Sequence, residues 1–155
     1  MNDSISAPNN TASRQHWMSV LARASAVAIE SGLARAGGLP SWQRLRGPET
    51  GLVMVRGRAG GSGSPFNLGE MTVTRCTVRL DCGLAGHAYV SGRDERQAEL
   101  AAVADALLQD PARHARLRDM LIEPLADAQR NQRLERAEKA AATRVEFFAM
   151  RNMRS

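Results

Sequence analysis

The chain has 155 residues, enough for one domain with a buried core, and its 43% hydrophobic and 24% charged residues are ordinary for a globular protein. No apolar run approaches the length of a membrane span. The polar N-terminus, Met1 to Ser13, lacks the basic start and apolar stretch of a secretory signal peptide. We therefore expect a disordered leader over residues 1–12, a single domain over 13–150, a tail over 151–155 and a cytoplasmic location without membrane contact.

The net charge is +5 and the pI about 10.5, and nearly all of the positive charge is arginine, because Lys139 is the only lysine. The planar guanidinium group fits the oxygens of phosphate, phosphonate and carboxylate groups. A genome rich in G and C also favours arginine codons, and composition alone favours this simpler explanation. The basic charge is therefore compatible with an anionic ligand or partner without identifying one.

Two cysteines, Cys76 and Cys82, and three scattered histidines, His16, His87 and His114, match no zinc-binding spacing. Two thiolates are also too few to hold an iron–sulfur cluster. We expect no metal site in this chain, and both thiols to stay reduced in a reducing compartment.

The first part of the chain predicts two helices. Apolar residues recur at helical spacing within residues 14–24, and a second short helix over residues 26–36 ends at Gly37-Gly38. The residues on the apolar face of the first helix are Trp17, Val20, Leu21 and Ala24.

The middle of the chain predicts antiparallel strands. Short strands are expected over residues 42–46 and 52–58, separated by a turn at Gly47-Pro48-Glu49. A glycine-rich loop, 59–69, precedes the clearest strand, 71–80, which forms a hairpin with a strand over 85–91.

The remainder predicts helices. Asp94 is the expected N-cap of the first, with Gln97 as its capping-box partner, and Asp110-Pro111 begins another. Glu123-Pro124 is expected to end that helix, and a last helix, about 125–149, follows with one apolar side. That side comprises Leu134, Ala137, Ala141, Val145 and Phe148. The fold class is therefore α+β, with N-terminal helices, a three- to four-stranded antiparallel sheet and C-terminal helices.

The last helix has two possible roles. It is longer than a small sheet can cover, and its apolar stripe is narrow, which favours a contact with a partner. Equally, it can fold back and cover its own core.

The glycine-rich stretch from Gly57 to Gly63 resembles a phosphate-binding loop only superficially. It lacks the terminal lysine followed by serine or threonine, and a proline and a strand follow it instead of a helix. A hairpin loop is the better interpretation.

Charged residues on the strands form the candidate site. Arg56 and Arg58 alternate on one strand and Arg75 and Arg79 on another, so each pair points to one sheet face. If the two faces coincide, four guanidinium groups converge, and Glu70 can join them. A solvated outer face is the alternative, but clustered like charges favour an anion site or a subunit contact. Arg93, beside the capping Asp94, completes the candidate set, and no residue is assigned a catalytic role.

A string of short motifs supports a family resemblance. Their order and spacing resemble the G subunit of phosphonate carbon–phosphorus lyase, the PhnG family, from about residue 13 to 150. The motifs are Arg14-Gln-His-Trp-Met18, Glu49-Thr-Gly-Leu52, Gly69-Glu-Met-Thr-Val-Thr-Arg75, Val78-Arg-Leu80, Gly86-His-Ala-Tyr-Val90, Gly92-Arg-Asp94 and Arg144-Val-Glu-Phe-Phe148.

The resemblance implies an accessory subunit of a cytoplasmic core complex containing two copies each of the G, H, I and J subunits. With the L protein, the G, H and I subunits support replacement of adenine on Mg-ATP by an alkylphosphonate. The I subunit is expected to carry that chemistry, and the J subunit to break the carbon–phosphorus bond later. Mg-ATP and alkylphosphonate are then substrates of the complex, and this chain alone is expected to bind no cofactor and to catalyse nothing.

A small basic RNA-binding domain is the alternative function. It is disfavoured because only 4% of residues are aromatic and the strands lack paired aromatic side chains on which bases stack. We therefore expect no nucleic-acid partner. A stand-alone enzyme is disfavoured because the sequence offers no convergent set of polar groups.

Overall fold

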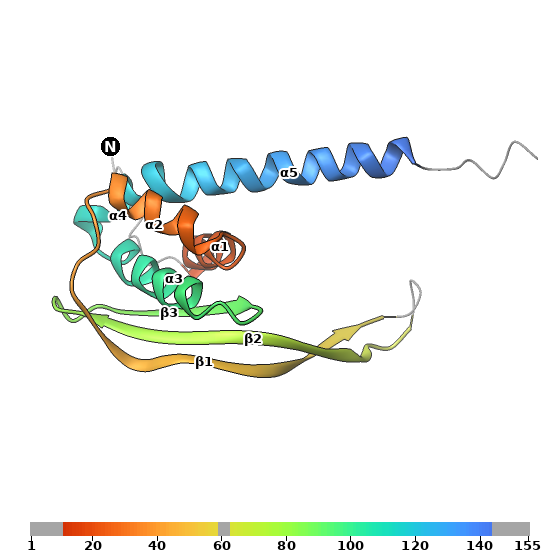
Figure 1. The fold of residues 1–155 in the computed structure, drawn as a ribbon, viewed down its shortest axis with the longest axis horizontal. Helices are drawn as coiled ribbons and strands as arrows, with labels where there is room; N and C mark the ends of the chain where they lie inside the picture. Colours follow the sequence, from red (N-terminus) through yellow and green to blue (C-terminus); the bar gives the residue numbers. More distant parts are fainter. Residues whose placement is uncertain (1–10, 59–62, 144–155) are drawn as a thin grey trace, which may run out of the picture.

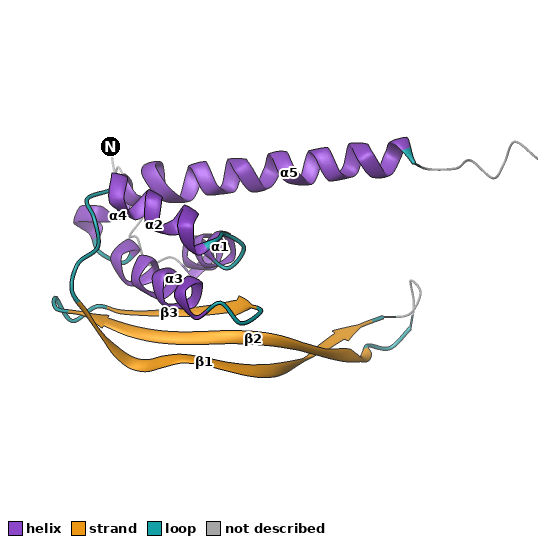
Figure 2. Cartoon of the chain, viewed as in Figure 1, coloured by secondary structure: helices purple, strands orange, loops and turns teal. Residues whose placement is uncertain are grey.

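The computed structural model describes residues 11–58 and 63–143, in which helices cover one face of a three-stranded antiparallel sheet (Figures 1 and 2). The N-terminal helices precede the sheet and the remaining helices follow it, so the predicted α+β class is confirmed. Among the helices of these described residues, none is long and apolar enough to cross a membrane.

Two short helices, α1 (Thr11–Leu21) and α2 (Ala26–Arg35), cover part of the core. The predicted apolar face of the first helix is buried, from Trp17 to Ala24. The second helix stops at Gly37 and Gly38, whose φ angles of 126° and 87° lie in a region that glycine adopts without steric cost. The predicted stop signal is therefore confirmed.

The sheet has the order β1-β2-β3, with β1 (Trp42–Gly57), β2 (Phe66–Leu80) and β3 (Ala85–Ser91). The predicted turn at Gly47-Pro48-Glu49 is wrong, because β1 continues through it as one strand with register shifts between Arg44 and Glu49. A bulge on an edge strand tolerates the missing N–H of Pro48, because that position makes no ladder bond. The loop between β1 and β2 is also shorter than predicted, since β2 begins at Phe66.

The centre of the core is α3 (Glu95–Leu108), which is buried from Gln97 to Leu108 because it lies between the sheet and the other helices. Asp94 caps it as predicted, accepting a hydrogen bond of 2.9 Å from the Gln97 backbone N–H. The Gln97 side chain does not complete a capping box, because it donates instead to the carbonyl of Ala22. Gln97 therefore ties the N-terminus of α3 to the end of α1.

The C-terminal helices are α4 (Pro111–Leu117), a π-helical turn η1 (Arg118–Ile122) and α5 (Glu123–Ala142). Asp110-Pro111 starts α4 as predicted, but the predicted break at Glu123-Pro124 is wrong. The π turn widens the helix just before Pro124. In a regular α-helix the N–H of residue 124 would donate to the Met120 carbonyl, but proline has no N–H. The Arg35 guanidinium donates to that carbonyl instead. The chain therefore stays helical through the proline.

Two elements extend from the same side of the domain, α5 from the helical layer and the β1–β2 hairpin from the sheet (Figure 1). The 20 residues of α5 span about 30 Å at ~1.5 Å per residue, and none of them is buried. Val145, Phe148, the tail and residues 1–10 of the predicted leader lie outside the described residues. The last two residues of that leader, Thr11 and Ala12, instead form the start of α1.

Candidate subunit-binding surfaces

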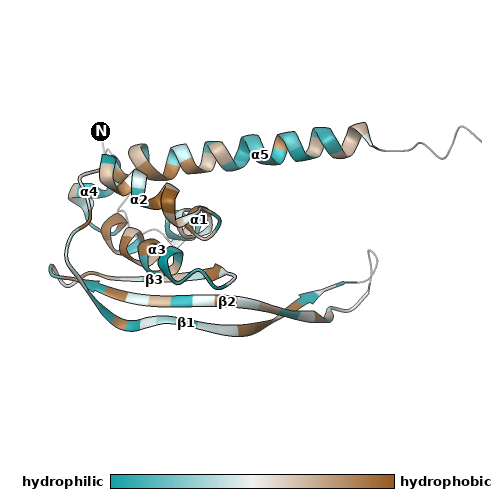
Figure 3. Cartoon of the chain, viewed as in Figure 1, coloured by the Kyte–Doolittle hydropathy of each residue, from teal (hydrophilic) through white to brown (hydrophobic). Residues whose placement is uncertain are grey.

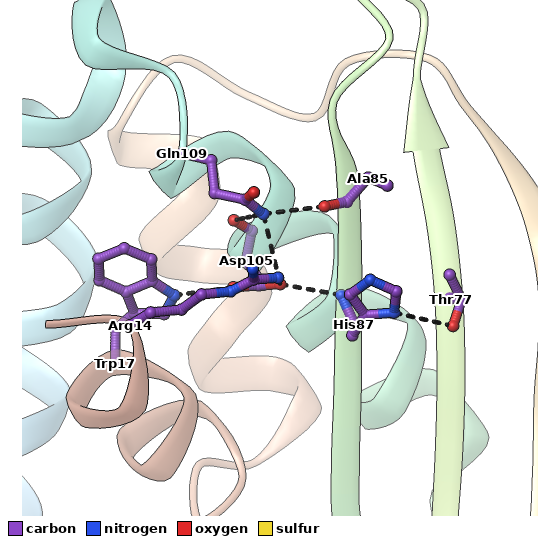
Figure 4. A network of polar contacts seen from close by, with 7 residues as sticks. All are labelled: Arg14, Trp17, Thr77, Ala85, His87, Asp105 and Gln109. Atoms are coloured by element: carbon purple, nitrogen blue, oxygen red, sulfur yellow. Dashed lines mark hydrogen bonds and ion pairs between the residues drawn. The ribbon is translucent and has the colours of Figure 1, made fainter. Parts of the chain in front are cut away.

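The most buried acidic group of the described residues, Asp105, is held by four donor residues from three elements or their ends (Figure 4). The Arg14 guanidinium donates to both carboxylate oxygens at 3.1 and 2.7 Å, and the Trp17 indole N–H donates at 2.9 Å. The backbone N–H of His87 adds a bond of 2.9 Å, and Gln109 bridges Asp105 to Ala85. This carboxylate therefore joins α1, α3 and β3.

A second buried carboxylate, Glu99, is held in the same way on an earlier turn of α3. Arg44 donates from Nε and Nη2 at 2.6 and 2.8 Å, and the Trp42 indole N–H donates at 2.9 Å. The Arg44 guanidinium holds the pKa of Glu99 below its ordinary value, against the opposing effect of burial. Glu99 therefore stays ionised and anchors β1 to α3.

These two carboxylates were not predicted as interacting groups. Two sequence features could have indicated them. Glu99 and Asp105 stand within an otherwise apolar helix, and both α1 and β1 carry an arginine and a tryptophan two or three positions apart. Because every oxygen of the two carboxylates accepts at least one hydrogen bond, both groups are satisfied within the fold and link its elements.

The described residues contain no cluster of three or more histidine, cysteine, aspartate or glutamate side chains arranged to hold a metal ion. The two cysteines are free thiols. Cys76 is buried on the helix-facing side of β2, and this burial raises the pKa of its thiol, while Cys82 is exposed in the turn between β2 and β3.

The sheet face opposite the helices carries two of the predicted arginines. Arg75 and Arg79 alternate with the buried Cys76, Val78 and Leu80, so both point away from the helices. Arg75 forms an ion pair of 3.0 Å with Glu49 on β1, whereas Arg79 has no ion pair with a described residue. This outer face also carries His87, whose ring hydrogen-bonds Thr77, and the half-exposed Tyr89.

The structure does not bring the four predicted arginines together. Arg56 pairs with Asn67, and the β2 segment from Asn67 to Arg75 separates the two sites by roughly 26 Å at ~3.3 Å per residue. Arg58 lies just beyond β1, and Glu70 pairs opposite Met54 on the same distant part of the hairpin. Arg93 is exposed in the turn between β3 and α3, next to Gly92, whose N–H donates to the Thr72 carbonyl of β2.

The distant part of the hairpin forms a projecting, apolar surface, which we call the β-arm and define as Leu52–Gly57 of β1 and Phe66–Met71 of β2. Because β3 pairs with β2 only from Val73 to Arg79, the β-arm has two strands where the rest of the sheet has three. Its large side chains are exposed, with Leu52 at 64%, Met54 at 60% and Leu68 at 58%, and Figure 3 shows the hydrophobic stretch along β1. Val55, Phe66 and Met71 are exposed as well.

The second projecting surface is the outer part of α5. The predicted apolar side does not face the core, since Leu134 is 57% exposed and Ala137 and Ala141 are exposed beside it. The interpretation that this helix covers its own core is therefore wrong for the described residues from Leu134 onward. The beginning of α5 does contact the rest of the domain, through Leu125 and Ala126 in the core and through the Gln129 side chain, which donates to the Val20 carbonyl.

Together these features define a class of protein: a small α+β domain whose buried charges maintain the fold and whose apolar projections lie outside the core, as in subunits of larger assemblies. The family model for the phosphonate metabolism protein PhnG matches residues 12–152. A relative from Rhizobium meliloti (strain 1021), the alpha-D-ribose 1-methylphosphonate 5-triphosphate synthase subunit PhnG, is 46% identical over 139 residues. That similarity covers 90% of this chain and 88% of the relative. The chain belongs to the PhnG family, as the motif resemblance predicted.

Proposed function

We propose that this chain is an accessory subunit of a carbon–phosphorus lyase core complex that acts in alkylphosphonate catabolism. The family and the relative's name, a subunit of a ribose 1-methylphosphonate 5-triphosphate synthase, support this role. The reaction supported by the complex converts Mg-ATP and an alkylphosphonate to a ribose 1-alkylphosphonate 5-triphosphate and adenine. The chain contributes contacts to that complex and leaves the chemistry to other subunits.

The partners in this proposal are the H, I and J subunits, with the L protein as a functional partner and two copies of this chain in each complex. The complex works in the cytoplasm. Mg-ATP and the alkylphosphonate are substrates of the assembly, and this chain holds no cofactor by itself.

The β-arm is the observation that carries the proposal. A two-stranded hairpin is only marginally stable in water without further packing, and this one exposes apolar side chains such as Leu52, Met54 and Leu68. Contiguous exposed apolar surface marks interaction sites in soluble proteins. Contact with a partner subunit would bury these side chains and hold the hairpin extended.

Arg75 and Arg79 provide a second, charged contact in this proposal. The Glu49 carboxylate neutralises Arg75 only partly, because Arg46 lies 3.8 Å from the same carboxyl group. A carboxylate from a partner at this outer face would complete the pairing, and Arg93, Arg56, Arg58 and Glu70 are candidates for the rim of the interface.

The alternative, RNA binding by the sheet, has little support on the outer face. Tyr89 is the large aromatic side chain that β3 exposes there, and β2 offers arginines and threonines beside it instead of a second stacking ring. Salt-dependent binding of single-stranded RNA to the purified chain, stronger than its association with the lyase subunits, would favour this alternative.

Reconstitution tests the proposal. With ATP and methylphosphonate, the purified chain alone should release no adenine, the full set of subunits should release it, and omission of this chain alone should abolish the reaction.

A Leu52→Ser, Met54→Ser, Leu68→Ser variant tests the β-arm. It should fold normally but fail to join the complex on size-exclusion chromatography. Arg113→Gln, on α4 and away from the β-arm, serves as the control for assembly. Adenine release by the chain alone at the rate of the full set, or normal assembly of the triple variant, would contradict the proposal.

A further inference from the structure

A pocket with a volume of about 530 Å³ lies between the α1–α2 turn, the end of β3 and the middle of α5. It is separate from the predicted sites, none of whose residues lines it. Its lining residues are Arg23, Ser91, Gln129, Gln132, Arg133 and Arg136.

The geometry of α5 sets the composition of this pocket. Gln129, Arg133 and Arg136 recur at i, i+4 and i+7, so they share one face of the helix. The Gln129 side chain donates to the Val20 carbonyl at 2.9 Å, which turns that face toward the end of α1, where Arg23 lies. Three guanidinium groups therefore lie around one pocket although they come from parts of the chain far apart in sequence.

The charge of the pocket is not balanced within the described residues. Arg23, Arg133 and Arg136 have no ion pair with any described residue, whereas Arg130 on the same helix pairs with Asp127 at 3.1 Å. The acidic residues of this part of α5 do not line the pocket, since Asp127 and Glu138 fall on the opposite face by helical spacing and Glu135 falls on a flank of the helix. Like charges three positions apart on a helix destabilise it unless an anion lies nearby, so Arg133 and Arg136 favour a bound anion.

We propose that this pocket binds a small ligand that carries several phosphate or phosphonate groups. Each guanidinium can donate two parallel hydrogen bonds to such a group, and the side-chain amides of Gln129 and Gln132 and the hydroxyl of Ser91 add neutral donors. The lining residues include no carboxylate that would repel the ligand. The volume lies in the range of small-molecule sites and exceeds the needs of a single phosphate, so a linear triphosphate fits the charge and the space better than a monoanion.

Isothermal titration calorimetry of the full-length chain with inorganic triphosphate at low ionic strength tests this site. We expect saturable binding of one triphosphate per chain, and weaker binding of methylphosphonate. The double variant Arg133→Gln, Arg136→Gln should bind triphosphate at least about tenfold more weakly, since a single charge-assisted hydrogen bond is worth about that factor. Arg23→Gln should weaken binding in the same direction.

The double variant Arg113→Gln, Arg118→Gln is the matched control, because it removes the same charge from exposed arginines outside the pocket and outside the proposed contact surfaces. It should bind triphosphate like the unmodified chain. All the substituted side chains are exposed, so circular dichroism should show every variant folded. Absence of saturable triphosphate binding would overturn the proposal. An equal loss of triphosphate affinity in the control variant would also overturn it, since such a loss indicates a diffuse effect of net charge.

Discussion

At the scale of single residues, two buried carboxylates on α3 join the layers of the fold. Asp105 accepts hydrogen bonds from Arg14 and Trp17 of α1, and Glu99 accepts hydrogen bonds from Arg44 and Trp42 of β1. In each case an indole N–H and a guanidinium group satisfy the carboxylate, which makes burial of the charge tolerable. Removing either partner would leave a buried charge without compensation, so these groups specify how α1, α3 and β1 pack.

Glu99 gives the fold a defined pH dependence. The Arg44 guanidinium lowers the pKa of Glu99 in the folded state, whereas the unfolded chain has the ordinary value of about 4.3. The stabilisation that the Glu99–Arg44 ion pair provides is therefore fully present above about pH 5, and it is lost as the pH falls through the lowered pKa of Glu99 in the folded state. We expect Glu99→Gln to reduce the free energy of unfolding at pH 7 and to flatten its decline on acidification.

Urea denaturation followed by circular dichroism between about pH 3 and pH 7 measures this effect. Glu138→Gln, on the exposed surface of α5, is the control and should give the same profile as the unmodified chain. Parallel profiles for the Glu99 variant and the unmodified chain would show that the Arg44 pair contributes nothing to acid sensitivity.

At the scale of elements, the close contact between β3 and α3 depends on Gly86. A Cβ atom there would lie 2.0 Å from the Ala102 carbonyl oxygen and 2.5 Å from the Ala106 backbone nitrogen, both backbone atoms of a buried helix. Neither atom can move without displacing α3. We therefore expect Gly86→Ala to lower the free energy of unfolding by about 1–3 kcal/mol or more, as overpacking does.

Gly51→Ala is the matched control, because a Cβ at that position in β1 meets nothing within 4 Å. Thermal and urea denaturation of the two variants should differ clearly, with Gly51→Ala close to the unmodified chain. Equal stability of both variants would mean that β3 and α3 can separate at no cost.

Local sequence signals predicted most elements and the hairpin of β2 with β3, but not the pairing of β1 with β2. Caps such as Asp94 and Asp110, the stop at Gly37-Gly38 and the alternation in β2 depend on neighbouring residues, so the sequence reveals them. The continuity of β1 through Pro48 depends on its pairing with β2, and the helix that continues through Pro124 receives a hydrogen bond at Met120 from Arg35 of another helix. Such long-range causes leave no local pattern.

The candidate site shows the same limit. Alternation correctly predicted that Arg75 and Arg79 share a face of β2, but only the register of β1 and β2 shows that Arg56 lies far from them. The apolar β-arm was missed because the apolar run Leu52–Val55 also fits a strand that is buried in a sheet. What exposes Leu52 and Leu68 is the shortness of β3, which leaves this part of the hairpin uncovered.

At the scale of the whole molecule, stability and exposed apolar surface are separated in space. The core lies between the sheet and the helices, around α3, whereas the β-arm and the outer part of α5 project from one side of it (Figure 1). Neither projection has a buried layer of its own. Their positions on the same side mean that a partner lying against that side can contact both at once.

Hydrogen exchange should reveal this division. In the isolated chain, backbone amides of the β-arm and of residues 134–142 in α5 should exchange quickly, because few packed side chains oppose local opening there. Amides of α3 from Ala98 to Ala106 should exchange slowly, since that segment is buried throughout. In the assembled complex, the β-arm and the outer part of α5 should become protected while α3 stays unchanged, which makes α3 an internal reference. Full protection of 134–142 in the isolated chain, unchanged on assembly, would contradict the assignment of α5 as a contact surface, and the same result for Leu52–Gly57 would contradict that of the β-arm.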